Sequence, residues 1–197
     1  MSASSTTPAP RLSPLPPGEW DELLTRILEG SPGGTEEPMH IFATLARAPQ
    51  LFRRWIGFGA ALLGGGALTP RLRELVILRT AYRFDGRYEW AQHIEMGERE
   101  GVTRPEVVAL GGDLDAATWT PLERAALAAV DDTADAGAVS DATWAVLAAE
   151  LDDSELIELL MLIAHYMMLT TVLRSLHMTL EPRAEALARS VDAGPAG

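Results

Sequence analysis

Residues 68–110 read LTPRLRELVILRTAYRFDGRYEWAQHIEMGEREGVTRPEVVAL and carry the clearest helix signals in the chain. Thr69-Pro70 and Thr103-Arg104-Pro105 each combine an N-cap threonine with a proline in the first helical turn, which is a common helix start. Between them, Asp85-Gly86 and Gly101 are of the type at which helices end. The stretch therefore predicts two helices separated at Asp85-Gly86 and a third that begins after Thr103.

Start signals of the same kind recur along the rest of the chain. Thr120-Pro121-Leu122-Glu123 and Asp152-Asp153-Ser154-Glu155 each place a capping side chain three residues before a glutamate, which is the capping-box pattern. No segment alternates apolar and polar residues between turn signals as a strand would. The sequence therefore predicts an all-α helical bundle of about eight to ten helices. Outside the first stretch, helices are expected over residues 19–29, 39–47, 49–63, from 120, over 140–150 and from 152.

The two ends of the chain differ in composition from its middle. Residues 1–18 are rich in Ser, Thr, Pro and Ala, which is typical of a disordered lead-in. Residues 19–191 are expected to form a single helical domain, and residues 192–197 a flexible tail. The first residues lack the charged and apolar regions of a signal peptide, so a cytoplasmic protein is expected.

Charge and cysteine content exclude several classes of function. The chain has 197 residues, a formal net charge of −12 and no cysteine. The negative charge argues against nucleic-acid binding, because phosphate contacts need a clustered basic surface. The absence of cysteine excludes disulfides, thiolate catalysis and zinc–thiolate sites. Residues 156–176 are apolar enough to span a bilayer, yet they contain Glu158, His165 and Arg174, so we expect a buried helix and no membrane partner.

Glu74 is the first residue that could carry chemistry. On a helical wheel it falls beside Ile77, Leu78 and Ala81, away from the arginines of the same helix. A carboxylate in an apolar sector is desolvated, which raises its pKa and suits proton transfer. The alternative is a structural glutamate paired with an arginine of a neighbouring helix, and the wheel does not separate the two.

Glu89 and His93 form a second candidate pair on the next helix. They lie one turn apart, so their side chains meet on one face, which Met96 shares. A carboxylate beside an imidazole can orient the ring and raise its basicity. The alternative is an exposed salt bridge, which is a common use of this spacing.

The stretch from Leu68 to Leu110 resembles the core motif of the carboxymuconolactone decarboxylase and alkylhydroperoxidase D family, and a looser likeness runs from Met39 to Glu181. Peroxidase members carry a glutamate, then Cys-x-x-Cys, then a histidine four residues after the second cysteine. Glu74 and His93 match the glutamate and the histidine.

The likeness departs from the peroxidases at the two thiols. Gly86 and Glu89 occupy the cysteine positions, so the redox pair is missing. Decarboxylase members instead carry Glu-Leu-x-x-His, and Glu89-Trp90-Ala91-Gln92-His93 matches that frame at both polar ends. They usually have a small hydroxyl residue where this chain has Glu74, so the chain mixes features of both groups.

The resemblance implies an alkylhydroperoxidase D-like bundle that assembles as a homo-oligomer and needs no cofactor and no metal. It also implies acid/base chemistry of a lyase or isomerase type, decarboxylation or isomerisation, on a small carbonyl or lactone compound. In this hypothesis His93 is the general acid/base, Glu89 orients it, and Glu74 is a second proton-transfer group. The alternative is a non-catalytic binding or scaffold protein that keeps the fold.

Several further expectations accompany this hypothesis. Trp90, Met96, His165 and Tyr166 are predicted to line the substrate pocket, although a histidine in an apolar helix is also a common core residue. Leu51, Phe52, Trp55 and Phe58 recur at helical spacing and suggest an oligomer contact. Functional polar residues often cost stability, so Glu74→Gln, Glu89→Gln and His93→Asn are each expected to leave the melting temperature unchanged or raised.

Overall fold

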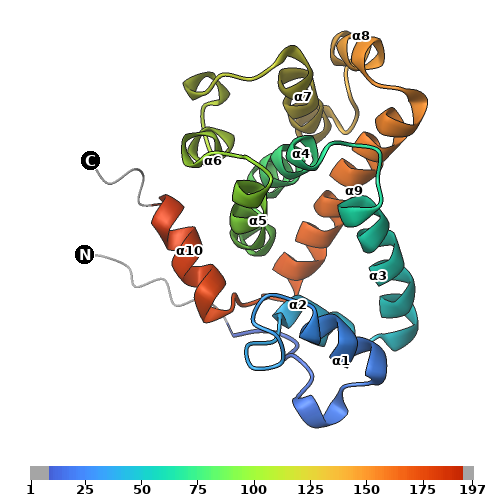
Figure 1. The fold of residues 1–197 in the computed structure, drawn as a ribbon, viewed down its shortest axis with the longest axis vertical. Coiled ribbons are helices and arrows are strands. Elements are labelled where there is room, and N and C mark those ends of the chain that lie inside the picture. Colours follow the sequence, from blue (N-terminus) through green and yellow to red (C-terminus); the bar gives the residue numbers. More distant parts are fainter. Residues whose placement is uncertain (1–8, 193–197) are drawn as a thin grey trace.

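Helix α4 (Pro70–Arg83) is the central element of the computed structural model, which describes residues 9–192 (Figure 1). Residues 72–81 are buried without a break, because α4 packs against α5, α7 and α9. Residues 9–192 contain helices and no strand, so the predicted all-α fold is confirmed. The other helices are α1 (Glu22–Glu29), α2 (His40–Leu45), α3 (Pro49–Gly64), α5 (Arg87–Arg99), α6 (Arg104–Leu110), α7 (Pro121–Ala136), α8 (Asp141–Glu150), α9 (Asp153–Ser175) and α10 (Pro182–Asp192), with short 3₁₀ helices at Pro17–Glu19 and Leu114–Ala116.

The predicted helix starts are confirmed by their capping geometry. The side chain of Thr69 accepts a hydrogen bond from the backbone N–H of Leu72 at 3.3 Å. Thr120 and Asp152 open α7 and α9 with complete capping boxes. Each cap satisfies a backbone donor that the first turn of a helix leaves free, which is why these short patterns mark the starts reliably.

Residues 9–18 differ from the expected disordered lead-in, because they lie against the domain. The backbone N–H of Leu15 donates to the carbonyl of Ala43 at 3.0 Å, and that of Arg11 donates to the carbonyl of Leu176 at 2.9 Å. Leu15 also packs into the apolar cluster around Leu24. The expectations for residues 1–8 and 193–197 lie outside the described residues.

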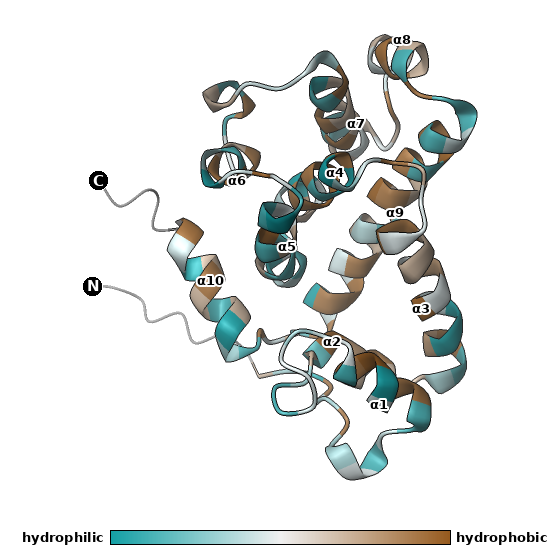
Figure 2. Cartoon of the chain, in the orientation of Figure 1, coloured by the Kyte–Doolittle hydropathy of each residue, from teal (hydrophilic) through white to brown (hydrophobic). Residues whose placement is uncertain are grey.

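Helix α9 is the apolar helix that the sequence marked as a possible membrane span. Among the described helices it alone is long and apolar enough to cross a membrane, and half of its most apolar window is buried within the fold. It packs against α3, α4, α5 and α8, as a central core helix does (Figure 1). Much of α9 is coloured as hydrophobic in Figure 2. The exposed apolar side chains on its other face are Ile157, Leu160, Met161, Met168 and Val172.

The residues expected to form an oligomer contact do not share one exposed face. Phe52 is buried, and Trp55 is half-buried in the apolar cluster with α1 and α2, whereas Leu51 and Phe58 are exposed. The burial of Phe52 and Trp55 arises because α1 folds back over α3, which helical spacing alone does not reveal. The exposed face of α9 is therefore the larger unpartnered apolar surface, and homo-oligomer formation stays a prediction.

Candidate functional site

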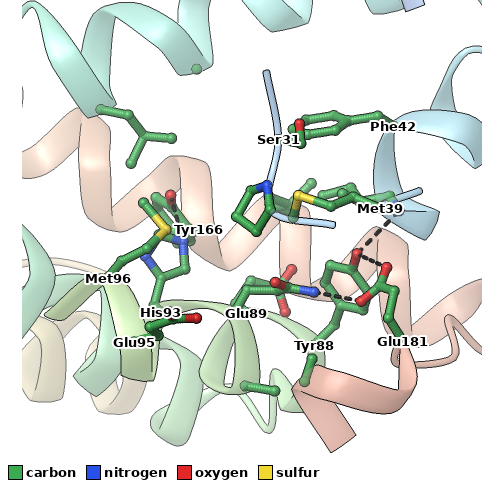
Figure 3. Close-up of a pocket in the computed structure, with 18 of the residues that line it drawn as sticks. Ser31, Met39, Phe42, Tyr88, Glu89, His93, Glu95, Met96, Tyr166 and Glu181 are labelled. Carbon is green, nitrogen blue, oxygen red and sulfur yellow. Dashed lines mark hydrogen bonds between the residues drawn. The ribbon is translucent and has the colours of Figure 1, made fainter. Parts of the chain in front are cut away.

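A cavity of about 500 Å³ lies between α3, α5 and α9, and is bordered by residues 30–39 and α10. Its volume falls within the range of small-molecule sites in proteins. Apolar and aromatic side chains make up most of its wall. Figure 3 shows His93, Glu89 and Tyr88 along α5, with Met39 and Phe42 facing them from the α2 side.

Three helices contribute one continuous chain of hydrogen bonds at this cavity. Nδ1 of His93 on α5 lies 2.8 Å from Oε2 of Glu74 on α4. Nε2 of the same ring lies 3.1 Å from the hydroxyl of Tyr166 on α9. An ionised carboxylate only accepts hydrogen bonds, so Nδ1 carries a proton, and in neutral imidazole Nε2 then accepts from Tyr166. His93 and Tyr166 line the cavity, while Glu74 lies behind them and is fully buried.

The environment of Glu74 differs from the one predicted. Burial by itself would raise its pKa, but the attraction of His93 and hydrogen bonds from His93 and Arg73 outweigh burial and lower the pKa below its ordinary value. Nε of Arg73, the neighbouring residue on α4, lies 3.1 Å from Oε1 of Glu74. The expected raised pKa is therefore wrong, because a wheel shows the sector of a residue and not the partners that reach into it.

Glu89 shows the property that was expected of Glu74. It is 2% exposed, and neither carboxylate oxygen has a hydrogen-bond partner among the described residues. Burial raises its pKa to about 7. The hydroxyl of Thr170 is near enough to lower this value slightly, but it does not meet hydrogen-bond geometry and is itself without a partner among the described residues. The prediction that Glu89 orients His93 is wrong, since Glu74 holds Nδ1 of that ring.

Gly86, at the N-terminal end of α5, leaves room for the Glu89 side chain. A Cβ at residue 86 would lie 2.9 Å from Oε2 of Glu89 and 2.5 Å from Oγ1 of Thr170. Both distances are shorter than a Cβ tolerates. The backbone of Gly86 has a φ of −85°, so its conformation alone does not require glycine. The close approach of the two side chains is the reason that residue 86 lacks one.

We expect Gly86→Ala to lower the free energy of unfolding by about 1–3 kcal/mol, because the added methyl group overpacks the site. In a Glu89→Ala background the same change should cost less, although not nothing, because Thr170, whose Oγ1 is the nearer atom, still remains in the way. Urea unfolding of the four proteins in this double-mutant cycle measures the coupling. Equal costs in the two backgrounds would show that Glu89 and residue 86 do not compete for space.

Aromatic rings form a connected wall on the α3 and α9 side of the cavity. Trp55 stacks on His165 with ring centroids 6.2 Å apart and planes 15° apart. His165 contacts Tyr166 edge-on at 5.3 Å, and Tyr166 contacts His93 at 5.1 Å. Burial lowers the pKa of His165, which keeps its imidazole neutral near pH 7. His165 is thus both part of the core and part of the cavity wall.

Two outcomes concern the predicted pocket residues. Met96, His165 and Tyr166 line this cavity, and their place in a substrate pocket stays a prediction. Trp90 does not, because its side chain leaves α5 in another direction and packs beside Tyr82 and Gly111 in a separate depression. The expectation that Trp90 lines the same pocket as His93 is wrong. It rested on the position of Trp90 within the motif, and the motif does not show which face of α5 a residue occupies.

Glu181 is a cavity residue that the sequence did not single out. It precedes α10 and is 4% exposed. Its carboxylate accepts a hydrogen bond from the hydroxyl of Tyr88 at 2.7 Å (Figure 3). It also accepts from Nε2 of Gln92 at 2.6 Å and from the backbone N–H of His40 at 2.5 Å. It therefore ties α2, α5 and α10 together. A glutamate before a proline gives no sequence signal for such a role.

Metal-ligand geometry is not found in the described part of the chain. No group of three or more His, Asp or Glu side chains between residues 9 and 192 is arranged as a metal site. Glu74, Glu89 and His93 have different environments, with Glu74 bonded to the imidazole and Glu89 separate from both.

Comparisons with known proteins agree with this architecture. Residues 49–132 match the model of the carboxymuconolactone decarboxylase family, which confirms the resemblance of the chain to this family and its alkylhydroperoxidase D-like relatives. The segment contains Glu74, Glu89 and His93. No protein with a curated description matches the chain.

Solved structures share the fold at low sequence identity. The debrominase Bmp8 is 18% identical with a TM-score of 0.75, covering 91% of this chain and 97% of its own. A cysteine-to-alanine variant of Bmp8 in complex with 2,3,4-tribromopyrrole is 17% identical with a TM-score of 0.76, covering 91% and 96%. The alkylhydroperoxidase AhpD core of an uncharacterised peroxidase-related protein from Ralstonia eutropha is 17% identical with a TM-score of 0.77, covering 90% and 97%.

Proposed function

We propose that this protein catalyses acid/base chemistry without a cofactor, either decarboxylation or isomerisation, on a small and mostly apolar carbonyl or lactone compound. The observation that carries the proposal is the Glu74–His93–Tyr166 chain, which ends at a mostly apolar cavity. Such a chain matches the general arrangement in which an orienting carboxylate, an imidazole and a hydroxyl group act together. The neighbour that holds 2,3,4-tribromopyrrole supports a small ring compound as the size class.

Tyr166 is the proposed donor to the substrate. Burial and the negative charges of Glu74 and Glu89 raise its pKa well above the ordinary value, so the phenol stays protonated at neutral pH. When His93 takes up a second proton, Nε2–H donates to the Tyr166 oxygen, and the phenolic O–H is free to donate into the cavity. Glu74 stabilises the imidazolium that this requires. The phenol then stabilises negative charge on the carbonyl oxygen of an enolate.

Glu89 is the proposed proton-transfer group at carbon. A carboxyl group with a pKa of about 7 is present in both protonation states near neutral pH, as a general acid/base needs. In isomerisation its ionised form removes a proton from the carbon beside the carbonyl group and returns it at another carbon. In decarboxylation carbon dioxide leaves, the electron pair enters the enolate, and protonated Glu89 delivers the proton to carbon. Both routes balance without an oxidant or reductant.

The test is turnover on a panel of β-keto acids, ketones and unsaturated five-membered lactones in deuterated water. Nuclear magnetic resonance follows carbon dioxide release and deuterium incorporation at carbon. We expect Tyr166→Phe to lower kcat by about 10²-fold, because general acid/base assistance is of that order. Tyr82→Phe is the control, since Tyr82 is exposed outside the cavity. Unchanged turnover in Tyr166→Phe would contradict the proposal.

A non-catalytic small-molecule-binding role is the second candidate. Both ring nitrogens of His93 already have hydrogen-bond partners, Glu74 and Tyr166. These bonds would hold the ring in the same way if His93 were purely structural, which favours the binding role. The same panel separates the two functions. Saturable binding of panel members without turnover supports the binding role, whereas turnover that depends on Tyr166 supports the enzyme.

A further inference from the structure

Unpaired buried polar atoms gather at the cavity. Among residues 9–192, five buried side-chain nitrogen or oxygen atoms have no hydrogen-bond partner, and they belong to Trp55, Glu89, His165 and Thr170. Trp55, Glu89 and His165 line the cavity, and Thr170 meets Glu89 beside Gly86. Buried polar groups in folded proteins are nearly always hydrogen-bonded. Their concentration at one cavity means that their partners are water or a bound molecule, and a molecule that fills the cavity displaces the water.

Glu89 determines which polar group this molecule presents. An ionised carboxylate accepts hydrogen bonds and donates none, so its partner carries an N–H or O–H group. The two arginines that line the cavity, Arg99 and Arg183, are both bonded to Glu95 and are more than half exposed. Near Glu89 there is therefore negative charge without a paired cation, which disfavours an anionic group at that end of the ligand.

The cavity wall determines the shape of the molecule. The rings of Trp55, His165, Tyr166 and His93 follow one another with centroids 5.1–6.2 Å apart. Ring faces and edges at such spacing favour flat, unsaturated rings over saturated ones. The indole N–H of Trp55 and Nδ1 of neutral His165 are further unpaired groups on the same wall.

We propose that the cavity binds a neutral, flat, unsaturated ring compound whose N–H or O–H group donates to Glu89 while the ring lies against Trp55 and His165. The inference rests on the cavity of the proposed function and narrows its substrate class: a neutral compound carries no carboxylate to lose, so of the two proposed reactions it favours isomerisation. It concerns binding alone, so it is measured on compounds that do not react.

The experiment compares indole with indene and 1-methylindole, which have similar shape and lack the N–H donor. Binding to the full chain is titrated by ligand-observed nuclear magnetic resonance at about pH 8, where Glu89 is ionised. We expect indole to bind about 10-fold or more tightly than the other two, because a hydrogen bond to a charged group is stronger than one between neutral groups. At about pH 5 the preference should shrink, because Glu89 is then protonated.

Three variants assign the preference to Glu89. Glu89→Leu should bind the three compounds within about 2-fold of one another, and Glu89→Gln should show an intermediate preference for indole. Glu181→Gln is the matched control: it lies on the same cavity, makes hydrogen bonds within the chain, and should keep the full preference.

Three results would overturn the inference. One is equal binding of the three compounds to the native chain, and a second is no saturable indole binding below about 1 mM. The third is a preference for indole that survives in Glu89→Leu, because the N–H group would then donate to a residue other than Glu89. The outcome is separate from that of the proposed function, because unchanged turnover in Tyr166→Phe leaves the donor preference intact.

Discussion

Replacing Glu89 by glutamine is expected to raise the free energy of unfolding by about 3 kcal/mol at about pH 8, and by almost nothing at about pH 4. Burial lifts the pKa of Glu89 from the ordinary 4.5 to about 7 in the folded chain. Each pKa unit corresponds to about 1.4 kcal/mol, so a difference of roughly 2.5 units gives the stated figure.

The sign follows from the protons that each state binds. Between the two pKa values the folded chain keeps a proton on Glu89 that the unfolded chain has released. Stability therefore falls as the pH rises through this window. Below the window the carboxyl group is neutral in both states, and above it the folded chain bears the full cost of a buried charge. Glutamine is neutral at every pH and avoids that cost.

Urea unfolding of both proteins at a series of pH values measures the difference. Glu150→Gln serves as the control, because Glu150 is an exposed glutamate at the end of α8 and should change stability little at any pH. If Glu89→Gln proved less stable than the native chain at about pH 8, the carboxylate would have to make a stabilising contact in the folded state.

Glu74→Gln should have the opposite effect and lower the free energy of unfolding by about 3–5 kcal/mol near pH 7. The change removes the charge between Arg73 and His93, all three of which are buried. A buried guanidinium that loses its carboxylate partner is strongly destabilising. The lowered pKa of Glu74 means that this stabilisation is present above the ordinary carboxyl pKa and is lost as the pH falls through the folded-state value.

Two further variants identify the cause. Arg73→Met in the Glu74→Gln background should recover part of the loss, because it removes the unpaired buried cation. Glu95→Gln, which breaks surface ion pairs with Arg99 and Arg183, should cost about 1 kcal/mol or less. Thermal and urea unfolding measure all three. A Glu74→Gln protein as stable as the native chain would refute the structural role of the carboxylate.

These two predictions give opposite signs to variants for which the sequence alone predicts the same effect on stability. From the sequence, Glu74→Gln, Glu89→Gln and His93→Asn were all expected to be neutral or stabilising. The structure keeps that expectation for Glu89 and replaces it for Glu74, whose partners are Arg73 and His93. The sectors of a single helix do not reveal which side chain from the next helix reaches a carboxylate.

More of the fold than of the candidate site could be predicted from the sequence. Helix starts depend on local bonds between a capping side chain and the next turn, so Thr69, Thr120 and Asp152 identified them correctly. The contact between His93 and Tyr166 joins residues that are 73 positions apart and depends on how α5 and α9 cross. Helix α10 packs its alanines against Ala91, and no strong start pattern marked it.

The close approach at Gly86 also couples the substitutions that residues 86 and 89 tolerate. A Cβ at residue 86 would lie 2.9 Å from Oε2 of Glu89, so a side chain there requires the Glu89 carboxylate to leave its present position. A substitution at residue 86 is therefore expected to be penalised less when residue 89 or residue 170 changes with it. The two positions are epistatic in this sense, because the residue that is acceptable at one depends on the residue at the other.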